Sequence, residues 1–521
     1  MKRKNKYLIF ILLIILTIPT ILGLIHSGFF ASDDGNWMVI RFSAFYEALR
    51  SGQFPVRFLF RLNNLYGYPV ADFLYPLFMY LATPIHVLGF SFVESIKIVF
   101  GISMIFSTVF SYLWLRKKFT NMASLIGALA YTYFPYHLFD LYKRGSIGEI
   151  LGLSIVPFIF WQIERKNLLL VSLGIGLLIL AHNIIAFVFL PIIFIYMILI
   201  KINFKKIILS AVLSLGLSAF FWIPAIYDSQ FTVFSKTSVS DFSSYFVNFN
   251  NLSLFGFISL VTLLLSISIL FYKRNKYFIY FFVLFVIFGV LALPFSEFIW
   301  KLSPFTGLIQ FPFRLLSIVC LASAYLVSFQ VDYFKKNLKI IVSIIFLVLI
   351  FISAKDLIYP KSFQYYPDTF YSTNVDTTTV RNEYMPKWVK NIPVTVPDEK
   401  VKIISGKGEI SNLVNKGNVA FDTNSNEKIL VSVNTVYFPG WVVKVDGSKA
   451  SINYQQTGLI QFPVNSGDHS VVVYFTESTI RIIADLISII SIVVLISLLI
   501  FSLNLIDLVK KDKKKIVESY S

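Results

Sequence analysis

Long apolar stretches separated by short basic runs are the feature that most constrains this chain. Apolar stretches of about 20 residues are long enough to cross a bilayer as helices. Only helices or closed barrels satisfy the backbone polar groups inside a bilayer. Charged residues make up 14% of the chain, whereas soluble domains carry about 25%. The sequence therefore predicts a mainly α-helical protein that crosses a membrane many times.

Twelve stretches are predicted to form transmembrane helices. The first has a basic start and an apolar run longer than the about 7–15 residues of a signal peptide, so we interpret it as a retained helix. The stretch Phe73–Phe90 is also apolar enough to cross, but Pro76 and Pro84 favour a broken helix in the outer interface. The predicted spans are 7–29, 92–115, 121–138, 146–162, 168–181, 184–200, 207–227, 252–271, 277–293, 314–330, 338–354 and 480–506.

Seven short basic runs hold half of the 46 Lys and Arg residues. With twelve spans, all seven runs lie on one face, which the positive-inside rule assigns to the cytoplasm. Both termini are then cytoplasmic, in a multi-pass protein of the plasma membrane. The net charge of +18 is accordingly a topology signal, and no nucleic-acid partner is expected. The runs are Lys2–Lys6, Arg116–Lys118, Arg165–Lys166, Lys201–Lys206, Lys273–Lys276, Lys335–Lys339 and Lys510–Lys515.

This topology places two long segments outside the cell. Residues 30–91 form an outer loop, and residues 355–478 are polar, with turn signals such as Asp446-Gly447 between strand-like runs. The second segment predicts a β-sandwich-like domain inserted before the last helix. The predicted domains are 1–354 (transmembrane domain with outer loop 30–91), 355–478 (β-rich domain) and 479–521 (last helix and basic cytoplasmic tail).

Two adjacent acids, Asp33 and Asp34, follow the first span on the outer face. A carboxylate at the mouth of a membrane cavity can act as a general base toward an acceptor hydroxyl. Two adjacent carboxylates could also hold a divalent cation through oxygen ligands. The alternative is a solvated helix end. No cofactor is otherwise indicated, because the sequence has no Walker A motif, no CxxC pair and no GxGxxG after a strand.

Arginines at the outer face are the second candidate feature, because the planar guanidinium suits a lipid phosphate. The alternative role is a basic rim against anionic headgroups for Arg57 and Arg61, an interfacial anchor for Arg314 with its neighbouring Phe residues, and an ordinary loop ion pair for Arg144 with Glu149. The candidates are Arg41, Arg57, Arg61, Arg144 and Arg314.

His182 and Asn183 interrupt two apolar stretches. The stretch before them, Leu168–Ala181, would span roughly 21 Å as a helix, which is too short to cross. Either this helix begins among the cytoplasmic headgroups, or His182 and Asn183 lie below the outer surface and line a cavity. Simple helix capping by the pair is the alternative.

Several motifs in this order resemble bacterial polytopic proteins of the GT-C glycosyltransferase superfamily. More narrowly, the chain resembles the family labelled 6-pyruvoyl-tetrahydropterin synthase-related membrane proteins. The resemblance covers nearly the whole chain, and its motifs are DGNWMVIR, LYGYPVADFLYPL, PYHLFDLYKRGSIGE, AHNI, QFPFR, NEYMP and VYFPGWVVKVDG.

The resemblance implies an inverting transferase that moves a sugar from a polyprenyl-phosphate donor to a glycan, lipid or protein acceptor of the cell envelope. It also implies that Asp34, with Asp33 beside it, supplies the catalytic base. Tyr66, Tyr68 and Tyr75 could then stack on sugar or flank the isoprenoid, or else form an ordinary aromatic belt. A transporter or flippase of lipid-linked saccharides and a non-catalytic scaffold for envelope assembly are the alternative functions.

Overall fold

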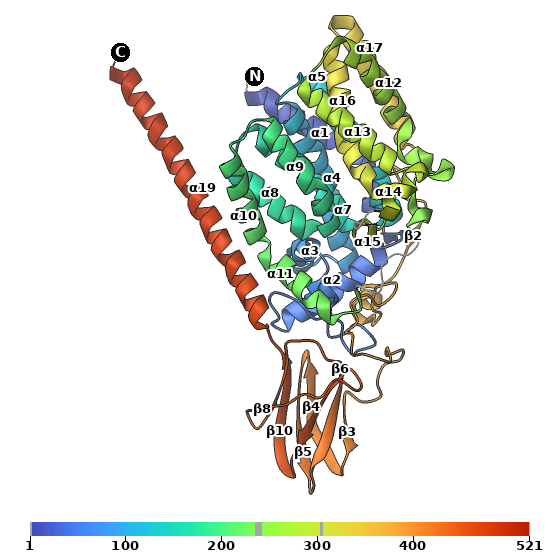
Figure 1. Ribbon diagram of the computed structural model, residues 1–521, viewed down its shortest axis with the longest axis vertical. Helices are drawn as coiled ribbons and strands as arrows, with labels where there is room; N and C mark the ends of the chain where they lie inside the picture. Colours follow the sequence, from blue (N-terminus) through green and yellow to red (C-terminus); the bar gives the residue numbers. More distant parts are fainter. Residues whose placement is uncertain (1–2, 235–241, 303–305, 520–521) are drawn as a thin grey trace.

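The computed structural model describes residues 3–234, 242–302 and 306–519. A helical bundle stands on an all-β domain (Figure 1). The start of α1 (Arg3–Ile25) and the far end of α19 (Thr479–Ser519) lie at one end of the molecule, and the β domain lies at the other. The side chains of residues 3–6, 336 and 503–519 are not described, so the runs Lys2–Lys6 and Lys510–Lys515 lie outside the described side chains.

The helices follow the predicted apolar stretches closely, with three differences. The predicted span 121–138 is divided into α5 and α6, the predicted span 207–227 is divided into α10 and α11, and short helices occur in the outer loop. Between α1 and α19 the α-helices are α2 (Gly35–Arg50), α3 (Leu77–Val87), α4 (Phe92–Leu115), α5 (Asn121–Thr132), α6 (Pro135–Phe139), α7 (Ile147–Glu164), α8 (Leu168–Ala181), α9 (Asn183–Leu199), α10 (Phe204–Leu217), α11 (Ala219–Asp228), α12 (Gly256–Tyr272), α13 (Lys276–Leu291), α14 (Glu297–Leu302), α15 (Thr306–Ile309), α16 (Leu316–Tyr333), α17 (Lys336–Ala354) and α18 (Asp368–Thr373).

Within the described residues, six helices are long and apolar enough to cross a membrane. Two bent pairs raise this number to eight: α10 with α11, bent by 72°, and α13 with the segment to Leu302, bent by 86°. Helices α8, α9 and α12 are apolar but shorter. The protein is therefore a multi-pass membrane protein, and the count of twelve spans stays a prediction.

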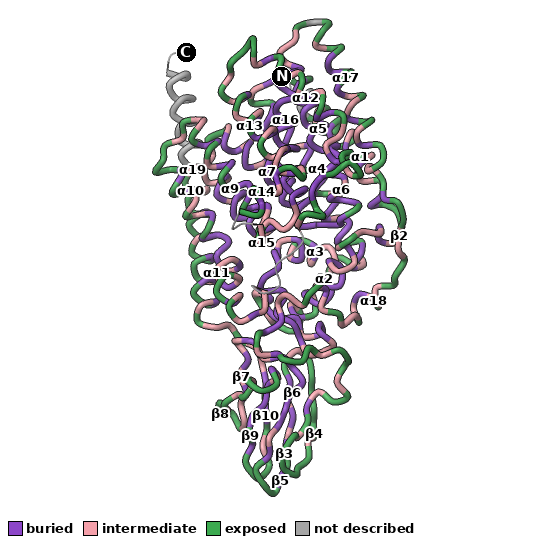
Figure 2. The backbone as a smooth tube through the Cα atoms, turned by 45° about the vertical axis from the view of Figure 1, so that its right-hand side comes forward, coloured by how far each residue is buried: buried purple, intermediate pink, exposed green. Residues whose placement is uncertain are grey.

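The centre of the bundle is formed by α4, α5, α7 and α16, which pack against one another. Almost every residue of α7 and α16 is buried, whereas α1, α17 and α19 expose apolar side chains (Figure 2). Exposed apolar faces are expected where a helix meets lipid, since lipid tails are as apolar as the side chains.

The predicted outer loop contains three helical elements, namely α2, a 3₁₀ turn η1 (Pro69–Asp72) and α3. Helix α3 has only 11 residues, or about 16 Å at 1.5 Å per residue, which is too short to cross. It contains Pro84 and begins after Pro76, the two prolines that argued against a span. Its place in the membrane interface stays a prediction.

The β domain consists of two antiparallel sheets with strand orders β4-β5-β10-β7-β8 and β3-β6-β9. Alternate residues such as Val431, Val433 and Val471 are fully buried and form its core. Asp446 and Gly447 have positive φ and join β7 to β8, so the predicted hairpin turn is confirmed. The strands are β3 (Val401–Ser405), β4 (Gly408–Lys416), β5 (Asn418–Ser425), β6 (Ile429–Val436), β7 (Trp441–Val445), β8 (Ser448–Ala450), β9 (Leu459–Val464) and β10 (Gly467–Phe475).

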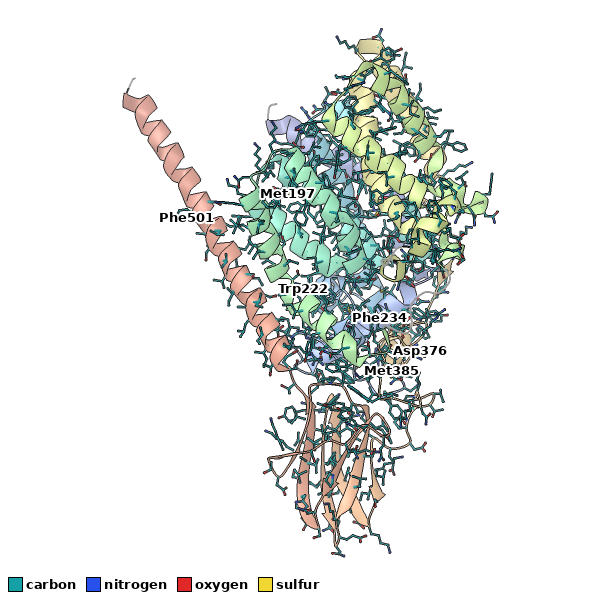
Figure 3. The ribbon with its side chains drawn as sticks, viewed as in Figure 1. Met197, Trp222, Phe234, Asp376, Met385 and Phe501 are labelled. Atoms are coloured by element: carbon teal, nitrogen blue, oxygen red, sulfur yellow. The ribbon has the colours of Figure 1, made fainter. Side chains whose placement is uncertain are left out.

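Residues 355–400 lie between α17 and the first strand of the β domain and pack against the outer loop. Strand β2 (Phe363–Gln364) pairs with β1 (Phe29–Phe30), which directly follows α1. Val233 donates its N–H to the carbonyl of Met385 at 3.0 Å, and Phe234 and Met385 lie near each other just above the β domain in Figure 3. Arg41 and Arg61 of the outer loop also donate hydrogen bonds to this segment, at Thr378 and Asn374, so the segment packs against the outer loop.

Candidate functional site

Asp34 directly precedes α2, but its side chain does not cap the helix. An Asp at this position normally accepts a hydrogen bond from the first turn of its helix. The Asp34 side chain makes no such bond, and its Oδ2 lies 3.9 Å from Nη2 of Arg144. The carboxylate is thus available for chemistry instead of capping the helix.

A turn from another part of the chain holds the acidic pair in place. The N–H groups of Asp33 and Asp34 donate to the carbonyls of Lys143 and Arg144 at 2.9 and 2.8 Å. The turn is a π-helical segment, η2 (Asp140–Arg144), that ends at Gly145 with a φ of +66°. A Cβ at Gly145 would lie 2.5 Å from Oγ of Ser32. Glycine is therefore required both for the backbone conformation and for this close approach.

We expect Gly145→Ala to lower the free energy of unfolding by about 1–3 kcal/mol, because positive φ and crowding against the Ser32 side chain both add strain. Thermal unfolding in detergent measures the loss. Gly447→Ala is the matched control, since Gly447 has a φ of +80° but open space around its Cβ. If both variants lose equal stability, crowding at Ser32 has no part in the effect.

Glu149 is the centre of a buried group of charges. Its Oε1 accepts from Nη1 of Arg144 and lies 2.8 Å from Nη2 of Arg314. Its Oε2 accepts a hydrogen bond from the Tyr136 hydroxyl at 3.0 Å. Two arginines from distant parts of the sequence thus share one carboxylate, which is fully buried at the start of α7.

Asp140 completes this group, since its Oδ1 accepts from Nη1 of Arg144 at 2.7 Å. Its Oδ2 is buried and has no hydrogen-bond partner among the described residues, so it could accept one further donor. A buried carboxylate needs cations nearby, because removing charge from water is costly. We call Asp34, Asp140, Arg144, Glu149 and Arg314 the central ion cluster.

His182 lies at the break between α8 and α9 and caps α9, which was the simpler of the roles that the sequence left open. Its Nδ1 accepts from the N–H of Ile185 at 3.2 Å and so caps α9. Its Nε2 lies 3.7 Å from Oε1 of Glu149, and its ring packs against Tyr75 with centroids 4.5 Å apart. Asn183 is exposed, and its side chain accepts from the next backbone N–H.

Asp34 is the accessible carboxylate of the central ion cluster. Its side chain is 33% exposed, whereas Asp140 and Glu149 are fully buried. Partial burial raises the pKa of Asp34, and Arg144 and Arg41 oppose this by lowering it. A carboxyl group with a raised pKa that still reaches solvent is suited to accept a proton.

The Asp33 carboxylate contacts a different side chain from the one that Asp34 approaches. Its Oδ1 lies 2.7 Å from Nζ of Lys143, and both side chains are more than half exposed. Within the described residues no group of three or more His, Cys, Asp or Glu side chains is arranged to hold a metal ion. A cation at Asp33 and Asp34 stays a prediction.

The other predicted arginines of the outer loop bind protein groups. Arg41 lies close enough to lower the pKa of Asp34, but its Nε donates to Oγ1 of Thr378 at 2.9 Å. Arg61 lies 2.7 Å from Oε2 of Glu47 and donates to the carbonyl of Asn374. Both arginines thus attach the outer loop to the segment before the β domain.

Arg57 belongs to a second group of charges, which we call the junction cluster. It lies 2.9 Å from Asp485 and 3.3 Å from Glu477, while Arg481 lies 2.9 Å from Asp228. Both arginines also approach the fully buried Asp72. The cluster consists of Arg57, Asp72, Asp228, Glu477, Arg481 and Asp485, and it joins the outer loop, α11 and the start of α19.

Of the three predicted tyrosines, only Tyr75 approaches the central ion cluster. It is buried, and the charges of Asp34, Arg144 and Glu149 all act on its hydroxyl. Tyr68 is buried against Thr379 and Tyr384. The carbonyl of Tyr66 accepts from the N–H of Val436 in the β domain. These two tyrosines therefore contact the region around the β domain.

Sequence reasoning missed Tyr136, Asp140 and most of the junction cluster. The sequence did contain a signal for the junction cluster, because Arg481 and Asp485 lie at the start of the last apolar stretch. Ionisable residues within membrane helices are rare and usually paired. Asp140 and Tyr136 also precede Arg144 closely in the PYHLFDLYKR stretch.

Comparison with known proteins gives similarities of limited extent. No family model matches the sequence. An uncharacterized protein of Lactococcus lactis subsp. cremoris (strain MG1363) is 26% identical over 276 residues, which cover 49% of this chain and 44% of the relative. The chain thus aligns with less than half of that protein's length.

Two similar solved structures are membrane glycosyltransferases. The arabinofuranosyltransferase AftD from mycobacteria is 14% identical, with a TM-score of 0.48 over 69% of this chain and 27% of that chain. The oligosaccharyltransferase of Archaeoglobus fulgidus is 15% identical, with a TM-score of 0.43 over 71% of this chain and 53% of that chain.

Proposed function

We propose that this protein is a GT-C-type glycosyltransferase of the 6-pyruvoyl-tetrahydropterin synthase-related membrane family. It moves a sugar from a polyprenyl-phosphate donor to a cell-envelope acceptor outside the plasma membrane, with inversion at the anomeric carbon. The observation that carries the proposal is the accessible Asp34 carboxylate beside the buried Arg144, which shares the Glu149 carboxylate with a second buried arginine, Arg314. A base and a phosphate-binding group are the two functions that this transfer needs.

In the proposed step, Asp34 takes the proton from an acceptor hydroxyl as its oxygen attacks the anomeric carbon. The bond between that carbon and the lipid phosphate oxygen breaks, and the oxygen keeps the electron pair. Arg144 and Arg314 stabilise the charge of the departing polyprenyl phosphate in a site with little water. Each guanidinium has five N–H donors, so both can bind a phosphate while they contact Glu149.

Glu149 and His182 position this site without touching the reacting atoms. Glu149 fixes both guanidinium groups through one carboxylate. His182 packs on Tyr75, whose ring fits against Gly148 so closely that a Cβ there would lie 2.2 Å from it. Tyr75 thereby supplies an apolar wall beside Asp34. Asp33, which binds Lys143 at the surface, is assigned no step.

Purified protein in lipid, incubated with a panel of polyprenyl-phosphate sugars and envelope acceptors, tests the proposal. We expect release of free polyprenyl phosphate together with a glycosylated acceptor. Movement of the lipid-linked sugar between leaflets without release would instead indicate a transporter or flippase. Neither release nor movement with the panel would contradict the proposal and favour an envelope-assembly scaffold.

The pH dependence of transfer follows from the environment of Asp34. The base must be ionised, so kcat/KM should fall as the pH falls through its pKa, which burial places above the usual value of about 3.9. Because Arg41 lowers this pKa, Arg41→Gln should move the acidic limb of the profile to higher pH. An unmoved limb in Arg41→Gln would mean that another group sets it.

A further inference from the structure

A cavity separate from the central ion cluster lies where α1 ends and α4 begins. Its volume is about 680 Å³, and none of its lining residues belongs to that cluster. One part of its wall is apolar and consists of Ile21, Leu24, Ile98 and Gly101. We call it the α1–α4 cavity.

The surroundings of the α1–α4 cavity are those of a lipid-facing surface. Ile25 of α1, which lines the cavity, is 73% exposed, and the neighbouring Leu22 of α1 and Ile102 of α4 are 47% and 43% exposed. These side chains lie on two helices long enough to cross the membrane. Acyl chains are therefore the expected neighbours of the apolar part of the cavity.

The remaining wall of the cavity carries charges of both signs. Lys97 is 7% exposed and donates to the carbonyls of His26 and Gly28 at 2.6 and 2.9 Å. Glu94 accepts from the N–H of Ser91 at 2.9 Å, and Asp368 accepts from the N–H of Phe92 at 3.2 Å. A cation and two carboxylates thus line one end of an otherwise apolar space.

Lys97, Glu94 and Asp368 can each form further hydrogen bonds with a ligand. The two bonds of Lys97 use two of the three N–H donors of its ammonium group, and each carboxylate offers about four acceptor positions. Lys97 lies about 8 Å along α4 from Phe92 at 1.5 Å per residue, and it is largely buried. The ligand should therefore offer an acceptor to Lys97 and a donor to Glu94 and Asp368.

We propose that the α1–α4 cavity binds one phospholipid whose headgroup carries both a phosphate and a protonated amine. The phosphate meets Lys97, the amine meets Glu94 and Asp368, and an acyl chain lies against the apolar wall. A purely anionic headgroup fits less well, because the two carboxylates would repel it.

Native mass spectrometry of the full-length protein, purified in detergent and supplied with defined lipids, tests this site. We expect one phosphatidylethanolamine molecule to be retained, with about tenfold preference over phosphatidylglycerol, which corresponds to one charge-assisted hydrogen bond. Glu94→Gln should reduce that preference, since Gln keeps an acceptor for the Ser91 N–H but loses the charge. Equal retention of both lipids, or a preference for phosphatidylglycerol, would overturn the proposal.

Two matched variants locate the bound lipid. A Cβ at Gly101 would meet only Leu24 Cδ1, at 3.8 Å, so Gly101→Phe can place its ring in the cavity and should abolish retention. Ile102→Phe adds bulk to the neighbouring lipid-facing position and should leave retention unchanged. Equal retention in both variants would overturn the assignment to this cavity.

Displacement of the lipid by an equal concentration of soluble phosphoethanolamine would overturn the role of the acyl chain.

Discussion

Asp34→Asn is expected to lower the rate of sugar transfer by about 10²- to 10⁴-fold, the contribution of a positioned general base. Asn has nearly the shape of Asp but cannot take a proton, and the Asp34 side chain does not cap α2. The helix should therefore begin normally in the variant. Release of polyprenyl phosphate, measured beside the thermal unfolding curve, separates lost chemistry from lost structure.

Asp33→Asn is the matched comparison for this result. Asp33 is adjacent in sequence, but its carboxylate binds Lys143 at the surface, so this variant should keep most of the activity. The opposite order of effects would transfer the base to Asp33. Full activity in Asp34→Asn would remove Asp34 from the proposed step.

Glu149→Gln is expected to have the largest effect on stability. Removing one partner of a buried ion pair costs about 3–5 kcal/mol, because the remaining charge is left uncompensated. Here two buried guanidinium groups, those of Arg144 and Arg314, lose their shared carboxylate. Thermal unfolding of the purified protein in detergent measures the loss.

Two further variants show whether charge or packing causes this loss. Tyr136→Phe removes only one hydrogen bond to Glu149 and should cost about 1–3 kcal/mol. Glu149→Gln combined with Arg314→Gln removes one charge of each sign and should be less destabilised than the sum of the single variants. Strict additivity would show that Glu149 and Arg314 do not stabilise each other.

Part of the candidate site could be predicted from the sequence because charges stand out in apolar surroundings. Asp34, Arg144, Glu149, His182 and Arg314 come from separate motifs, and the fold gathers them into one place. Each of them lies beside or within the first residues of a predicted span, and the predicted topology puts all five at the same face of the membrane. Because all five residues were expected at about the same depth in the membrane, the sequence restricted where they could lie. It did not show how the helices pack.

The partners of Arg57 and Arg61 could not be predicted in this way. Their spacing of four residues would bring them together only on a helix, but the chain from Val56 to Tyr68 is irregular. Arg57 instead reaches Glu477 and Asp485, which are more than 400 residues away along the chain. Sequence patterns describe local neighbours, and such contacts depend on how distant elements pack.

The same long separation has a consequence for how the protein is made. Arg57 and Asp72 are synthesised more than 400 residues before Glu477, Arg481 and Asp485. Until then the outer loop carries charges that lack their final partners. A chain that stops before α19 would leave Arg57 without Asp485. Helix α19 thus completes the junction cluster.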